Sequence, residues 1–189
     1  FKNAGNLILE GKKLLVNSGK VFIGGNAKVG EFDIQSNAQI NIQGDLLGLE
    51  EKTVEGKVDD ETHKGLDGLI NIGGKFNCKD LALGNACNFY ACSINVTGTL
   101  HLTGNGVKLH VNHVKSDKLL QDAGSKIYLV NNSVIECGTY TLTTNGQAAV
   151  TLEGPSSTAV FKANRFQFNG STTGDVYSFN STGIGSQIL

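Results

Sequence analysis

The residues that could do acid–base chemistry in this chain gather in one charged stretch, residues 50–67, which holds seven of the seventeen acidic residues. Its adjacent acids are Glu50, Glu51, Asp59, Asp60 and Glu61. Paired carboxylates act as general acid and base in polysaccharide-cleaving enzymes, which also set arginine or lysine on the same surface. Arg165 is the only arginine. We therefore predict no catalytic residue; the alternative is a polysaccharide lyase or hydrolase acting through Asp59, Asp60 or Glu61.

Three histidines, His101, His110 and His113, lie within thirteen residues of one another. Histidine is the commonest metal ligand, so such a group raises the question of a metal site. His101 and His110 alternate with apolar neighbours and are predicted to face solvent, whereas His113 shares the inward parity of Val111 unless a corner intervenes. The pattern therefore predicts surface histidines, with neither a metal site nor a cofactor.

Four cysteines, Cys78, Cys87, Cys92 and Cys137, could carry redox or metal chemistry. The spacings of 9 and 5 residues between the first three match no common zinc finger. Four cysteines permit three disulfide pairings, and the sequence does not choose among them. A zinc site, a disulfide and buried free thiols all stay open at this point.

The elements that would position these residues come from a recurring phrase. Val21 and Ile23 align with Ile40 and Ile42 after a step of 19 residues. In each copy a small or Asn/Gly corner precedes a short strand of alternating inward and outward residues. Further copies occupy residues 3–9, 69–74, 93–98, 99–104, 108–112, 122–129, 150–154, 165–170 and 176–181. Short strands at a fixed period indicate a coiling repeat.

This pattern predicts an all-β chain folded as a single right-handed parallel β-helix, or β-solenoid, over residues 1–189. Apolar columns should run through the pairs Val21/Ile40 and Ile23/Ile42. The corners are expected to need positive φ, which glycine adopts freely and asparagine tolerates. Twenty-five glycines and one proline suit a chain of that kind.

Residues 50–67 interrupt the period. From Ile42 to Ile72 the chain advances 30 residues, eleven more than one 19-residue step. The stretch has seven acids and three lysines, so its net charge is −4. We predict that residues 50–67 form a charged insertion outside the coil, which could be deleted with little loss of stability.

The charge and hydropathy of the chain indicate which classes of partner it is not expected to bind. The formal net charge is −1 with 17% charged residues, which predicts no nucleic-acid binding. No run approaches the roughly 18 apolar residues that a spanning helix needs, which predicts no membrane insertion by this segment. The sequence starts and stops within the repeat pattern, so we expect a piece of a longer protein whose uncapped rungs associate end to end.

At residues 14–26 (LLVNSGKVFIGGN) and 36–49 (SNAQINIQGDLLGL) the sequence resembles the shaft repeats of filamentous-haemagglutinin-like exoproteins. These large bacterial proteins, exported by two-partner secretion, include adhesins and contact-dependent inhibition toxins. The Asn-Pro signature of the family's export domain is missing, since the only proline, Pro155, follows Gly154. The resemblance implies a shaft segment and carries over no catalytic residue.

The combined expectation is a structural shaft or adhesion segment of a secreted or cell-surface bacterial protein. Its repetitive outward Asn, Thr and Ser would face a host-surface glycan or protein, whose identity the sequence does not give. Ice binding through threonine rows such as Thr139 and Thr141 would need several stacked copies, and few are found.

Overall fold

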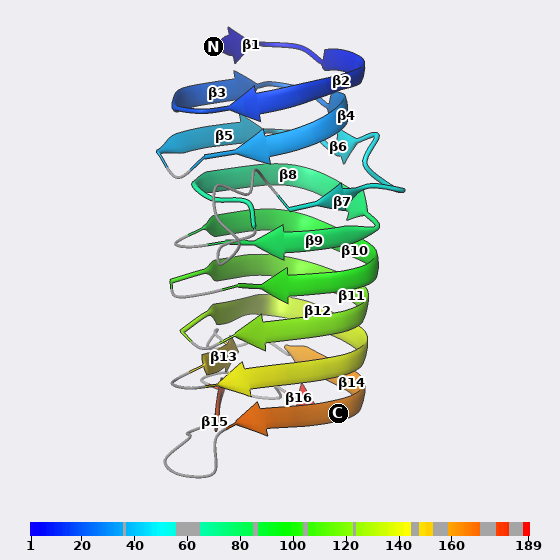
Figure 1. Cartoon of the computed structure of the whole chain (residues 1–189), viewed down its shortest axis with the longest axis vertical. Helices are drawn as coiled ribbons and strands as arrows, with labels where there is room; N and C mark the ends of the chain where they lie inside the picture. The colour runs from blue at the N-terminus through cyan, green and yellow to red at the C-terminus, as the bar shows by residue number, and fades with distance from the viewer. Residues whose placement is uncertain are drawn as a thin grey trace.

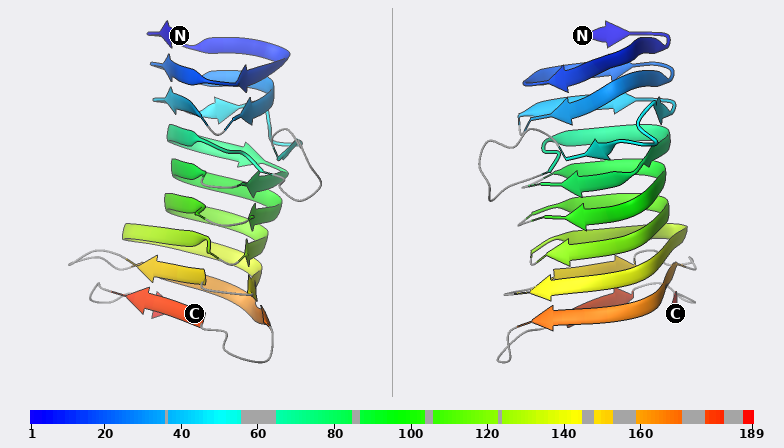
Figure 2. Two further views of the ribbon diagram at one scale, coloured as in Figure 1. Left: turned by 60° about the vertical axis from the view of Figure 1, so that its left-hand side comes forward. Right: turned by 45° about the vertical axis from the view of Figure 1, so that its right-hand side comes forward.

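The structure, a computed structural model, describes residues 1–35, 37–55, 65–84, 87–103, 106–122, 124–144, 148–152, 159–170, 177–181 and 187–189. Within these ranges every regular element is a β-strand, and none is a helix long and apolar enough to cross a membrane. The strands wind into an elongated right-handed coil, with the N-terminus at one end and the C-terminus near the other (Figures 1 and 2). The predicted β-solenoid is confirmed.

The coil has three faces, each built from parallel strands of successive rungs. On the first face nine strands stack in the order β1 (Lys2–Asn3), β3 (Gly19–Ile23), β5 (Ala38–Ile42), β8 (Leu69–Cys78), β10 (Asn88–Leu102), β11 (Lys108–Asp122), β12 (Lys126–Thr144), β13 (Ala148–Leu152) and β15 (Tyr177–Ser181). The long strands β8, β10, β11 and β12 turn a corner and continue onto the second face.

The second face is completed by β2 (Leu7–Val16), β4 (Ala27–Ile34), β6 (Leu46–Leu47), β14 (Val160–Gly170) and β16 (Gln187–Ile188). The third face holds β7 (Thr53–Val54), β9 (Asp80–Leu83) and the C-terminal parts of β2, β4, β10, β11, β12 and β14. Because equivalent positions meet in register on each face, a residue's place in the repeat decides its neighbours above and below.

The two predicted apolar columns are confirmed. Val21 pairs with Ile40, and Ile23 pairs with Ile42. The first column continues through Ile70, Phe89, Leu109 and Ile127, and the second through Ile72, Ala91, Val111 and Leu129. All of these continuing side chains are buried. Burial of such columns in every rung is the main force holding the coil together.

In the N-terminal rungs, side-chain oxygens hold the corner between the first and second faces. Asn6 Oδ1 accepts a hydrogen bond from the Asn26 N–H at 2.8 Å, and Asn26 Oδ1 accepts one from the Asp45 N–H at 2.9 Å. Asp45 Oδ1 then accepts from the Lys75 N–H at 2.7 Å. Among the described residues only Asn132 is a non-glycine with positive φ, at 57°. The expectation that asparagine serves this corner through its backbone conformation is therefore wrong for Asn26, whereas Asn132, at the same corner in β12, has the predicted positive φ.

Glycines precede this ladder of oxygens for a steric reason. A methyl group on Gly25 would collide with the Asn6 amide, and one on Gly44 would collide with the Asn26 amide. The backbone of each rung thus passes directly over the side chain of the rung before it. The glycines of the corner are required by this close approach.

The charged stretch 50–67 enters the coil at both of its ends. Thr53 and Val54 form β7, which pairs with β9, and Val54 is only 2% exposed. Leu66 is fully buried and forms a bridge with Leu83. Residues 56–64 lie outside the described residues. The predicted boundaries of the insertion are therefore too wide, because both flanks supply core leucine or valine side chains to the third face.

A polar pair lies inside the third face, where neighbouring rungs carry leucine. Gln121 aligns with Leu102 and Leu142, and it is fully buried. Tyr140 Oη donates to Gln121 Oε1 at 2.7 Å, and Gln121 Nε2 donates to the Ser125 carbonyl at 3.0 Å. Burial raises the pKa of Tyr140 above its ordinary value. The phenol therefore stays protonated and serves as a hydrogen-bond donor within the core.

Candidate functional site

The most distinctive surface feature is a stack of three rings on the outer side of the first face. Tyr90, His110 and Tyr128 occupy the same outward position in β10, β11 and β12. The rings of Tyr90 and His110 are 4.3 Å apart between centroids with an interplanar angle of 7°. Those of His110 and Tyr128 are 4.6 Å apart at 4°. We call these three residues the aromatic ladder.

The ladder follows from the geometry of parallel strands. Adjacent strands are about 4.8 Å apart, which is close to the separation of stacked aromatic rings. Rings at one register position in successive rungs therefore meet face to face without leaving their preferred positions. His110 is covered by a tyrosine ring on each of its two faces, and the stack links the outer surfaces of three rungs.

The ladder stops at Tyr90. The position above it in β8 is Asn71, an exposed residue with a shorter side chain. Tyr90 is 38% exposed, unusually open for a large aromatic residue. The face of the Tyr90 ring that His110 does not cover therefore points toward Asn71 in the neighbouring strand.

A shallow groove of about 420 Å³ runs beside Tyr90 and His110 at the corner between the first and second faces. The groove forms where a register shift follows Ala91 in β10 and another follows Val111 in β11. Its lining comprises Asn71, Ile72, Gly73, Tyr90, Ala91, Cys92, His110, Val111 and Asn112. None of these is an aspartate, glutamate, lysine or arginine, so the groove suits an uncharged ligand.

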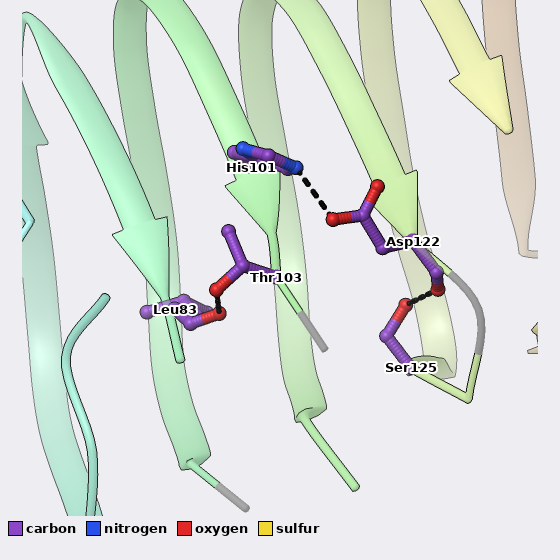
Figure 3. A network of polar contacts seen from close by, with 5 residues as sticks. All are labelled: Leu83, His101, Thr103, Asp122 and Ser125. Atoms are coloured by element: carbon purple, nitrogen blue, oxygen red, sulfur yellow. Dashed lines mark hydrogen bonds and ion pairs between the residues drawn. The ribbon is translucent and has the colours of Figure 1, made fainter. Parts of the chain in front are cut away.

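A histidine–aspartate pair lies on the third face (Figure 3). His101 Nε2 is 2.9 Å from Asp122 Oδ2, and both side chains are 34% exposed. The pair joins the ends of β10 and β11. An imidazole beside a carboxylate is the arrangement that orients a general base in many hydrolases, so its surroundings decide what it can do.

The hydroxyls near this pair brace the backbone. Ser125 Oγ donates to the Asp122 carbonyl at 2.7 Å, and Thr103 Oγ1 donates to the Leu83 carbonyl at 3.1 Å (Figure 3). Ser125 is also fully buried. Each of these hydroxyls thus donates to a backbone carbonyl, and the His101–Asp122 contact joins two neighbouring rungs.

The three histidines take separate places. His101 pairs with Asp122, His110 belongs to the ladder, and His113 is exposed on the second face. A corner of the coil lies between Val111 and His113, and it reverses the parity of His113. In the described part of the chain, no three His, Cys, Asp or Glu side chains are grouped closely enough for a metal ion.

The four cysteines are free thiols in the structure. Cys78, Cys87 and Cys137 are buried, and only Cys92 is exposed. Burial raises the pKa of the Cys137 thiol to about 12 and raises the pKa values of Cys78 and Cys87 further still. Of the alternatives the sequence left open, the structure contains the free thiols, and it places Cys92 in the groove beside the ladder.

A charged cleft that the sequence did not single out lies between β4 and the flank of the charged stretch. Its volume is about 290 Å³, and its charged residues are Lys13, Glu31, Asp33, Lys52 and Glu55. Asp33 is 1% exposed and lies 3.0 Å from Lys13 Nζ. Gln35 Nε2 donates to its other oxygen at 3.3 Å. Asp33 is thus paired with a lysine and an amide within the wall of the coil.

The acids proposed for the enzymatic alternative are not brought to a site by the described structure. Asp59, Asp60 and Glu61 lie outside the described residues. Glu50 and Glu51 are exposed at the start of the charged stretch, and Arg165 is exposed beside Thr139 on the third face. Thr139 is flanked by Lys118 and Arg165 in register, so no threonine row continues from it.

The sequence contains a signal for the aromatic ladder, although neither Tyr90 nor Tyr128 was predicted as a site residue. Both occupy the outward position of a short strand, as His110 does. Comparison with models of protein families, with curated proteins and with solved structures finds no match for this chain.

Proposed function

We propose that this chain is a shaft segment of a secreted or cell-surface bacterial exoprotein that works by binding and display rather than by catalysis. The observation that carries this proposal is the continuous stack of parallel strands along the first face, from β1 to β15. Each rung contacts only its neighbours, which makes a stiff spacer whose outer side repeats at a fixed rise. Kinship with filamentous-haemagglutinin-like proteins belongs to this proposal and rests on the repeat phrases.

Adhesion is the activity that such a surface supports best. The groove beside the aromatic ladder is uncharged, and the whole chain has a net charge of only −1. Host-surface glycans or proteins are therefore the partners we propose, with no role in binding nucleic acid or inserting into a membrane. A polar surface of this kind binds a partner weakly at one rung, and simultaneous contacts at many rungs raise the overall avidity.

The test combines binding with turnover. The 189-residue chain is applied to immobilised neutral and acidic glycans and to host-cell extracellular proteins, and the same glycans are incubated with it and assayed for new reducing ends or unsaturated products. We expect retention on at least one surface and no products. Product formation would establish the carbohydrate-active alternative, and absence of both binding and products would refute an adhesive role.

A further inference from the structure

The open end of the aromatic ladder is a ready stacking surface. His110 covers one face of the Tyr90 ring, and the other face looks toward the level of Asn71. An asparagine side chain ends well short of the outer part of a tyrosine ring. Within the part of the chain that the structure describes, Tyr90 stacks on His110 alone. A ring placed there would continue the stack and lie beside the groove.

We propose that the free face of Tyr90, with Asn71 above it and the groove beside it, binds one ring of an uncharged glycan. The inference rests on the proposed adhesive function and names its ligand and site. The C–H groups on one side of a pyranose ring carry partial positive charge, which complements the negative face of a tyrosine. The amides of Asn71 and Asn112 can both donate to and accept from sugar hydroxyls.

The charge of the site selects among sugars. Recognition of a carboxylate, sulfate or phosphate uses arginine, lysine or a cluster of N–H donors. The groove lining contains no lysine or arginine. A neutral hexose or N-acetylhexosamine therefore fits better than a uronate or a sulfated sugar. Stacking of a planar aromatic ligand is the rival outcome, because the same ring face would accept it.

The direct test is calorimetric titration of the 189-residue chain with cellohexaose, mannohexaose, chitohexaose and, as the acidic comparison, hexagalacturonate. We expect at least one neutral hexamer to bind, and to bind more tightly than the acidic one. Equal or tighter binding of hexagalacturonate would overturn the preference for neutral sugars. Binding of tyrosine amide without binding of any oligosaccharide would assign the surface to aromatic ligands instead.

Three variants locate the site. Tyr90→Ala removes the stacking face and should weaken binding about tenfold, the usual worth of one aromatic contact. Asn71→Tyr fills the ligand position with a fourth ring and should abolish binding while preserving the fold. Tyr128→Ala is the matched control, because it removes a ladder ring that does not line the groove.

The variants also separate this inference from the proposed function. If the parent chain binds glycans and both Tyr90→Ala and Asn71→Tyr bind as it does, the site is wrong and the adhesive function stands. If the parent chain binds none of the oligosaccharides, the inference fails, and retention on host proteins decides the function. Thermal melting of each variant shows whether a loss of binding reflects a loss of folding.

Discussion

At the scale of single residues, the chain depends on contacts between one rung and the next. The side-chain oxygens of Asn6, Asn26 and Asp45 accept hydrogen bonds from backbone N–H groups at a corner where the strand hydrogen bonds are interrupted. A buried or half-buried N–H left without a partner costs about 1–3 kcal/mol. The same corner needs Gly25 and Gly44, because any side chain there would displace the amide beneath it.

Gly44→Ala should therefore destabilise the coil by about 1–3 kcal/mol, the usual cost of forcing an extra methyl group into a packed site. Gly5→Ala is the matched control, because its nearest neighbour would be the Asn3 side chain at an ordinary contact distance of 3.8 Å. Urea unfolding followed by circular dichroism measures both. Equal midpoints for the two variants would show that the corner relaxes freely.

The composition of the corners could be predicted from the sequence, but the reason for it could not. Repeated Gly-Asn and Gly-Asp pairs mark a corner whatever holds it together. Whether Asn26 is there for its φ angle or for its amide depends on what lies one rung away. That neighbour is set by the register between rungs, which a 19-residue step gives only approximately. The groove beside Tyr90 could not be predicted either, because its walls come from neighbouring rungs whose register the sequence gives only approximately.

The thiols provide a second test at this scale. At pH 8 iodoacetamide should label Cys92 alone in the native chain, since the other three thiols are buried and their pKa values are raised by burial. Unfolding without reductant should expose all four to the reagent. Cys92→Ser should leave the native chain unlabelled. Fewer than four labelled thiols after unfolding would reveal a disulfide.

The same pKa shifts make stability depend on pH in a defined direction. An unfolded cysteine ionises near pH 8.5, whereas folded Cys137 does so at about 12. Between these values the unfolded state binds fewer protons than the native state, so stability falls as pH rises. Below pH 8.5 the contribution of these thiols is constant.

At the scale of elements, parity along each strand predicted the buried face well. Inward and outward positions follow the expected alternation in β5 and in residues 69–72 of β8, because both segments lie on the first face. Parity failed where a strand turns a corner. His113 follows Val111 by two residues and yet is exposed, since β11 turns the corner between the first and second faces at this point. The predicted limits of the charged stretch were too wide, because Val54 and Leu66 are core residues that lie among charged residues in the sequence.

The charged stretch therefore divides into parts with different expected effects. Replacing residues 56–64 with a Gly-Ser linker should shift the melting temperature by only a few degrees, because closure entropy changes slowly with loop length. Leu66→Ala should cost about 2–5 kcal/mol, because Leu66 is fully buried in the core. Scanning calorimetry compares the two. A large loss of cooperativity in the linker variant would show that residues 56–64 are integral to the coil.

At the scale of the whole molecule, the described rungs form one long stack. Parallel pairing continues through the described rungs from β1 to β15, which the 19-residue step predicted. The N-terminal end exposes core positions. Leu7, Leu9 and Leu14 are only partly buried, whereas their partners in the next rung, Ala27, Val29 and Phe32, are buried. Phe1 beside them is 71% exposed.

Such an end should recruit the opposite end of a second copy. Contact of the N-terminal end of one copy with the C-terminal end of another is heterologous, so it can repeat and build filaments. The uncovered edge of β2 would gain strand hydrogen bonds, and Leu9 would complete an apolar column. We therefore expect the average mass of the isolated 189-residue chain in sedimentation velocity to rise as its concentration increases from micromolar to high micromolar.

A matched pair of variants on β2 tests this mechanism. Leu9→Lys places a charge at an inward position of the open end and should hold the chain as a monomer, because stacking would bury that charge without a partner. Ile8→Lys changes the adjacent outward residue, which is 65% exposed, and should leave association unchanged. A parent chain that stays monomeric over the whole range would mean that its ends do not recruit one another. Equal association of both variants would mean that the copies meet through a side of the coil instead of its end.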